Sequence, residues 1–189
     1  YHNQPGIGQW NIARLAECML PLLDGDTDKA VDKANDVLKR FGETFQTNWI
    51  AVFRRKLGLE TAEAGDAALV QDLLTAMHEG KADFTLTFRR LTDLAAAEEG
   101  QAALAAEAAF TEGFMPWEKA ESWLPRWRAR LALEPESHDP AELMRSVNPA
   151  IIPRNHRIEQ AILAAMEGDL EPFNRLLEAL AEPYADKPE

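Results

Sequence analysis

Apolar residues recur at intervals of three and four along most of the chain, the spacing that gathers side chains on one face of an α-helix. These stripes run over residues 9–23, 31–57, 66–77 and 83–94, and a glycine follows each of the first three within a few positions. The sequence contains no runs that alternate apolar and polar residues between turn signals, as paired strands do. It therefore predicts an all-α protein.

Local signals predict about seven to nine helices. The stripe over 31–57 is one long helix or two helices broken at Gly42, and Gly58 marks its end as a cap residue. Asp83 and Asp139 are expected to cap the N-termini of two later helices. Residues 95–109 are alanine-rich and acidic, so we expect a helix there with little bulk to anchor it. No pattern repeats at a fixed period, which argues against a helical solenoid.

Charge and composition exclude several classes of partner. The formal net charge of −12 would repel a phosphate backbone, so nucleic acid and anionic membranes are not expected as partners. Charged residues interrupt every apolar segment before it reaches the length of a membrane-spanning helix, and a soluble protein is expected. The single cysteine, Cys18, can form no internal disulfide, which fits the cytosol. The chain starts at Tyr1 rather than methionine, so we interpret its N-terminus as a cut.

Few residues combine into a recognisable chemical site. His138-Asp139, with His78 and Asp169, invites comparison with metal-dependent phosphohydrolases, but Asp139 before Pro140 is better explained as a helix N-cap. Residues 154–157 form a basic cluster that could hold phosphate or carboxylates, although a solvated or internally paired helix start explains it better. A phosphate-binding glycine loop, a hydrolase nucleophile elbow and a Glu-x-x-His motif are all missing from the sequence.

Three blocks of residues nevertheless form a distinctive pattern in this order. The first is Tyr1-x-Asn3-Gln4-Pro5, with Gly8-x-Trp10-Asn11 and Arg14-Leu15-Ala16. The second is Asp83-x-Thr85-x-Thr87-Phe88-Arg89-x-Leu91, and the third is Asn148-Pro149 with Arg154-Asn155. In order and spacing they resemble motifs of the selenoprotein O family, and together they cover nearly the whole chain.

The resemblance implies a protein-kinase-like fold, a pseudokinase that transfers AMP from ATP to hydroxyl side chains of proteins, with Mg²⁺ as cofactor. In the family, the residues that hold the triphosphate and the metal precede the first block. No catalytic, cofactor-binding or metal residue is therefore expected in this chain. It would correspond to the helical C-lobe, about residues 1–135, and a C-terminal helical extension, about residues 136–189. The implied partners are the N-terminal kinase-like lobe of the same protein and its protein substrates, in the cytoplasm.

The residues of the three blocks are expected to be structural. These positions are Tyr1, Asn3, Gln4, Pro5, Trp10, Asn11, Asp83, Thr85, Thr87, Phe88, Arg89, Asn148, Pro149, Arg154 and Asn155. The family's C-terminal redox residue has no counterpart here, because Cys18 does not match its position. A stand-alone helical module that binds other proteins is the alternative function.

The apolar stripes also predict which side chains are buried and where apolar surface is left open. Five aromatic residues on these stripes are expected in the core: Trp10, Phe45, Trp49, Phe88 and Trp123. An exposed apolar patch is expected near Pro5, Ile7 and the first helix, where the missing lobe would sit.

Overall fold

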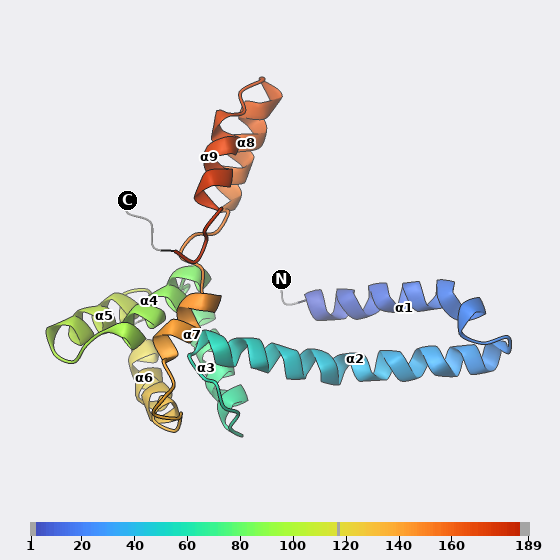
Figure 1. The fold of residues 1–189 in the computed structure, drawn as a ribbon, viewed down its shortest axis with the longest axis horizontal. Coiled ribbons are helices and arrows are strands. Elements are labelled where there is room, and N and C mark those ends of the chain that lie inside the picture. The colour runs from blue at the N-terminus through green and yellow to red at the C-terminus, as the bar shows by residue number, and fades with distance from the viewer. Residues whose placement is uncertain (1–2, 117, 186–189) are drawn as a thin grey trace. The chain divides into compact units, whose positions relative to one another are not determined.

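The computed structural model describes residues 3–116 and 118–185, and that part of the chain contains nine α-helices and no strand (Figure 1). The prediction of an all-α fold is confirmed. The helices are α1 Gln4–Leu23, α2 Thr27–Lys56, α3 Asp66–Glu79, α4 Phe84–Ala96, α5 Gln101–Thr111, α6 Glu118–Leu131, α7 Pro140–Val147, α8 Asn155–Met166 and α9 Glu171–Ala179. None of the described helices has the length and apolar character needed to cross a membrane.

The chain forms two compact units, residues 1–52 and residues 53–189. The predicted boundary near residue 135 is a different division, and it stays a prediction. The first unit is an antiparallel hairpin of α1 and the part of α2 up to residue 52 (Figure 1). Asp26 accepts a hydrogen bond from the Asp28 backbone N–H at 3.0 Å, which starts α2 after the turn at Gly25. α2 continues through Gly42 without a break, so the long helix and not the broken one is observed.

An aromatic core organises the second unit. Trp123 and Trp127, one turn apart on α6, stack with ring centroids 6.1 Å apart, and Phe110 of α5 packs beside Trp123. Each indole N–H donates to a backbone carbonyl, Trp123 to Leu69 and Trp127 to Leu57, both at 2.9 Å. Through these contacts α6 holds both α3 and the end of α2. α4 packs on α5 and α7, and α8 packs on α9.

The burial predictions hold for the second unit and fail in part for the first. Phe88 and Trp123 are buried as predicted, whereas Phe45 and Trp49 are only half-buried. Trp10 was expected in the core and is 60% exposed, so that prediction is wrong. α1 carries apolar residues around its whole circumference, and in the first unit only α2 packs along it. The exposed apolar patch near Ile7 is confirmed.

The alanine-rich segment differs from its prediction in one way and agrees with it in another. It is not one helix, because α4 ends at Ala96 and α5 begins after Gly100. Gly100 has φ 103°, a conformation that residues with a side chain rarely adopt. No residue of 95–109 is fully buried, as its small side chains predict, and the buried Phe110 at the end of α5 lies just beyond this segment.

Candidate functional site

The most buried charged group in the described residues is the Asp66 carboxylate, at the start of α3. It accepts hydrogen bonds from the guanidinium Nε atoms of Arg54 and Arg130, each at 2.6 Å, and from the Glu63 backbone N–H at 2.9 Å. Burial alone would raise the pKa of Asp66, but the hydrogen bonds from Arg130, Glu63 and Arg54 outweigh it and hold that pKa below its ordinary value. The carboxylate therefore stays ionised.

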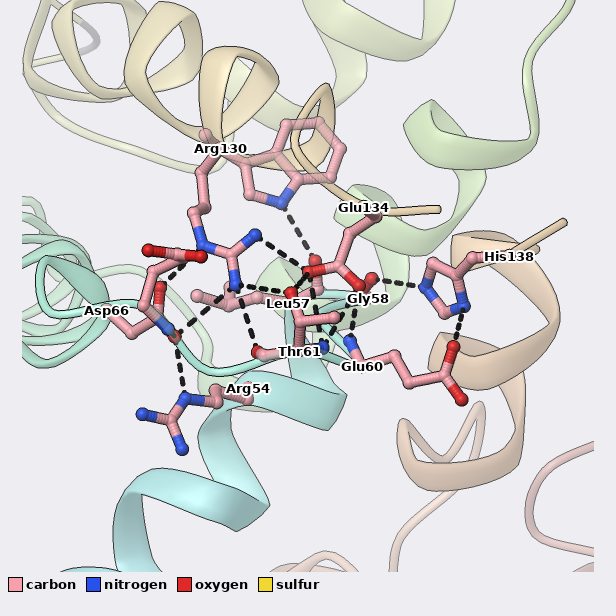
Figure 2. Close-up of polar contacts among 11 residues, drawn as sticks. Arg54, Leu57, Gly58, Glu60, Thr61, Asp66, Arg130, Glu134 and His138 are labelled. Carbon is pink, nitrogen blue, oxygen red and sulfur yellow. Dashed lines mark hydrogen bonds and ion pairs between the residues drawn. The ribbon is translucent and has the colours of Figure 1, made fainter. Parts of the chain in front are cut away.

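Arg130 links Asp66 to a second carboxylate, Glu134, four residues further on and just after the end of α6. Arg130 Nη1 donates to Glu134 at 2.7 Å, and its Nη2 donates to the Thr61 carbonyl at 3.0 Å. Glu134 also accepts the Thr61 hydroxyl at 2.7 Å and the Glu60 backbone N–H at 3.0 Å. Burial would raise the pKa of Glu134, but these hydrogen bonds from Thr61, Arg130 and Glu60 lower it. We call Arg54, Asp66, Arg130, Glu134 and Thr61 the arginine clamp (Figure 2).

The loop that the clamp holds, residues 57–61, is fixed from its other side by His138 (Figure 2). His138 Nε2 lies 2.7 Å from the Gly58 carbonyl, and because a carbonyl only accepts, this nitrogen carries the proton. Gly58 has φ 75°, and a β-carbon there would lie 2.8 Å from Pro140 Cβ. Glycine is therefore required where the end of α2 meets the start of α7.

Glu60, Glu134 and His138 form the one group of metal-type ligands found among the described residues, with ligand atoms within 4.8 Å of one another. Glu134 already accepts hydrogen bonds on both of its oxygens, and the Arg130 guanidinium lies beside it. A cation would compete with these donors, so the group fits a metal poorly. His78 and Asp169 do not join it. Asp139 accepts from the Glu142 backbone N–H at 3.0 Å, which confirms its role as an N-cap.

A second cluster joins the middle and last sequence blocks. Asp83 caps α4, because its side chain accepts from the Leu86 backbone N–H at 2.9 Å, as predicted. The same carboxylate binds both terminal nitrogens of Arg154, at 2.5 and 3.2 Å. The hydrogen bonds from Arg154 lower the pKa of Asp83, and that contact raises the pKa of Arg154. This pair ties the N-terminus of α4 to that of α8.

Asn148, which is fully buried, adds contacts from the third block to Lys56 of α2 and Thr92 of α4. The side-chain amide N–H groups of Asn148 donate to the Lys56 backbone carbonyl at 2.9 Å and to the Thr92 hydroxyl at 3.1 Å. The backbone carbonyl of Asn148 accepts from Arg89 at 3.4 Å. The Lys56 ammonium donates to the Val147 carbonyl at 3.1 Å and lies over the Phe88 ring, 5.4 Å from its centre. Burial lowers the pKa of Lys56. We call Asp83, Arg154, Asn148, Arg89, Lys56 and Thr92 the asparagine cluster.

The structure treats the three sequence blocks differently. In the first, Asn3, Gln4, Trp10 and Asn11 are exposed on or beside α1, Pro5 is half-buried, and Tyr1 lies outside the described residues. In the second, Thr85, Thr87, Phe88 and Arg89 are buried on α4. In the third, Pro149 is half-buried and Asn155 is exposed. The structure brings the second and third blocks together and leaves the first on a surface. The structural role of all these positions stays a prediction.

The arginine clamp was missed by sequence reasoning. Its one local signal is the Arg130–Glu134 spacing, because residues four apart on a helix are neighbours. Asp66 stands in the sequence at the start of the apolar stripe over 66–77, and its pairing with Arg130, 64 positions away, leaves no local trace. In both clusters, arginine side chains form ion pairs with carboxylates. A general acid or base needs a pKa near the working pH, whereas the pairs here lower the pKa of their carboxylates. Carboxylates with a lowered pKa are poorly matched to general acid–base catalysis near neutral pH.

Comparison with known proteins gives a consistent result over the full chain. A family model described as "Protein adenylyltransferase SelO" matches residues 1–181. A "Protein nucleotidyltransferase YdiU" of Rhizobium etli CIAT 652 is 55% identical over all of this chain and 37% of its own length. Proteins with the same name from Rhizobium leguminosarum WSM2304 and Cereibacter sphaeroides ATCC 17029 are 55% and 52% identical. The chain thus spans about a third of the length of these curated relatives, 36 to 37%.

Proposed function

The chain belongs to the SelO family of protein adenylyltransferases, and from that membership we propose that it is the helical, non-catalytic C-terminal part of such an enzyme. The full-length protein would be a cytoplasmic pseudokinase that transfers AMP from ATP, with Mg²⁺, to Ser, Thr or Tyr hydroxyls of other proteins. Its partners would be its own nucleotide-binding lobe and its protein substrates. The part described here would support that lobe and help to place the substrate.

The observation that carries this proposal is the pairing of arginine with carboxylate in both clusters. Arg54 and Arg130 bind Asp66, and Arg154 binds Asp83 through both terminal nitrogens. A bound triphosphate needs cations that are free to face it, and Mg²⁺ needs carboxylate oxygens with open coordination positions. The two clusters therefore do not fit ATP–Mg²⁺, and no step of AMP transfer is assigned to them. The net charge of −12 also opposes an anionic nucleotide.

The test is to incubate the 189-residue chain with ATP, Mg²⁺ and a generic protein acceptor, beside the full-length protein. AMP addition is followed by intact mass, and nucleotide binding by calorimetry. We expect the full-length protein to add AMP, and the 189-residue chain to add none and to bind ATP–Mg²⁺ no more tightly than millimolar. AMP transfer by the short chain, or micromolar binding that Arg154→Ala or Arg157→Ala abolishes, would overturn the proposal.

The exposed apolar residues of α1 favour a second candidate function, a module that binds other proteins on its own. The two candidates differ in the full-length protein. If the chain supports the catalytic lobe, deleting residues 1–189 from the full-length enzyme removes AMP transfer to every acceptor. If it only recruits partners, the deletion leaves transfer to a small generic acceptor intact, and the support role is then wrong.

A further inference from the structure

The turn between α1 and α2 contains the one Asp-Gly step of the sequence, Asp24-Gly25. The carboxyl group of an aspartate can react with the backbone nitrogen of the next residue, and glycine favours this reaction because it has no side chain to crowd that nitrogen. Every other aspartate of the sequence is followed by a residue with a side chain. Asp24 also lies outside both helices, in an extended conformation with φ −160° and ψ 153°. The turn therefore combines a reactive pair of residues with a backbone that neither helix fixes.

The Asp24 carboxylate is held at both of its oxygens. Oδ1 accepts a hydrogen bond from the Asp26 backbone N–H at 3.1 Å, and Oδ2 accepts one from the Lys33 ammonium at 2.8 Å. The same ammonium donates to the Leu23 carbonyl at 3.1 Å, so Lys33 joins the carboxylate to the end of α1. The Lys33 hydrogen bond is the main cause that lowers the pKa of Asp24, and the backbone N–H groups of Asp26 and Gly25 lower it further. Asp24 is therefore ionised at neutral pH.

We propose that Asp24-Gly25 is a modification site at which the chain forms isoaspartate through a succinimide, and that Lys33 restrains this reaction. In the first step the Gly25 nitrogen forms a bond to Asp24 Cγ, and a Cγ–O bond breaks. The oxygen leaves as water, with one proton from the carboxyl group and one from the Gly25 N–H. In the second step a water molecule opens the imide. When it breaks the bond between the Gly25 nitrogen and the Asp24 main-chain carbonyl carbon, the product is isoaspartate.

Lys33 acts on the first step, because the departing oxygen must be protonated. An ionised carboxylate has no good leaving group, whereas a neutral carboxyl group can lose water. The product would change the turn, since the main chain of isoaspartate runs through the former side chain and is longer by one carbon atom. The carboxylate would then leave its place between Lys33 and the Asp26 N–H. This proposal does not depend on AMP transfer.

The test follows isoaspartate during incubation of the full-length protein in neutral buffer, well below its unfolding temperature. An isoaspartate-specific methyltransferase measures the total, and fragmentation of the peptides by mass spectrometry locates it. We expect isoaspartate to accumulate at Asp24 faster than at any other aspartate. Lys33 is 57% exposed, so Lys33→Ala should fold normally, and it should raise the rate at Asp24 at least threefold. Lys33→Arg, which keeps the positive charge, should raise it less.

Two further variants make the result specific. Lys39→Ala is the matched control, because Lys39 lies on the same helix and pairs with Asp36 at 3.6 Å; it should leave the rate at Asp24 unchanged. A β-carbon at Gly25 would meet nothing within 4 Å, so Gly25→Ala should fold normally and form isoaspartate at least tenfold more slowly.

Three results would overturn the proposal. The first is a lack of isoaspartate at Asp24 even in Lys33→Ala, and the second is an equal rate in Gly25→Ala and the unmodified protein. Either result removes the modification site. The third is an equal rate in Lys33→Ala and Lys39→Ala, which removes the role of Lys33. No outcome is read from enzyme activity, so a failed test of the proposed function leaves this result interpretable.

Discussion

The two compact units differ in the kinds of side chain that they bury. In the described part of residues 1–52, the buried side chains are those of Ala30 and Ala34. Residues 53–189 enclose large aromatic side chains and also charged ones, including Trp127, Phe110, Asp66 and Arg130. Both units carry strong apolar periodicity, so periodicity alone does not make a core. The second unit has one because its helices meet from several directions and its buried polar groups find partners.

The largest expected loss of stability comes from removing a buried aromatic side chain of the second unit. Trp127→Ala removes a ring that is 1% exposed together with its hydrogen bond to the Leu57 carbonyl, so we expect a loss of about 3–5 kcal/mol in the free energy of unfolding of the 189-residue chain. Trp10→Ala is the matched control, because Trp10 is 60% exposed and should cost less than about 0.5 kcal/mol. Urea denaturation measures both. Equal losses would mean that the two units do not differ in packing.

The next effect concerns the arginine clamp. Arg130→Ala leaves the buried Asp66 and Glu134 carboxylates without their shared cation, and we expect a loss of about 3 kcal/mol or more. Arg128→Ala is the control on the same helix, since Arg128 pairs with a partly exposed Glu107 and should cost less than about 1 kcal/mol. A result for Arg130→Ala as small as the control would show that the clamp adds nothing to stability.

Acid should also lower the stability of the second unit, because it protonates the carboxylates of the arginine clamp. The pKa values of Asp66 and Glu134 are lower in the folded protein than in the unfolded chain, so the unfolded state binds more protons as the pH falls. The stability they contribute is complete above their ordinary pKa values near 4 and is lost as the pH falls through the lowered values. Urea midpoints at about pH 7, 5, 4 and 3 should therefore decline. Asp66→Asn should flatten that decline, and an unchanged slope would contradict the assignment.

The smallest expected effect lies at the edge of the asparagine cluster. Arg154 and Asp83 are both about one-third exposed, so solvent screens their attraction. Arg154→Ala should therefore cost no more than about 1 kcal/mol. Asn148→Ala should cost more, about 1–3 kcal/mol, because it leaves buried partners unsatisfied. Thermal unfolding of the two variants measures which substitution lowers stability more. A larger loss for Arg154→Ala would show that the ion pair contributes more stability than the buried Asn148 amide.

Sequence reasoning succeeded where the cause is local. The Asp83 cap, the Asp139 cap and the Gly58 terminus each depend on a few neighbouring residues, and the structure confirms all three. Sequence reasoning failed for Trp10. An apolar stripe predicts which face of a helix is apolar, but it does not predict which segment buries that face. Sequence reasoning also missed the clamp, since the charges of Asp66 and Arg130 resemble ordinary surface charges until the fold brings them together. The Asp83–Arg154 pair lies between these cases, because both residues were noticed and their contact was not predicted.

The arginine clamp also sets an order of events during synthesis. Asp66 leaves the ribosome 64 residues before Arg130, its partner on α6. At about 5–20 residues per second, that gap lasts roughly 3–13 s. During this time Arg54 is the one clamp cation already made, and the Thr61 loop lacks Glu134 as its acceptor. The ion pair at the start of α3 can therefore form only after α6 has been translated. The packing of the second unit is accordingly completed late in synthesis.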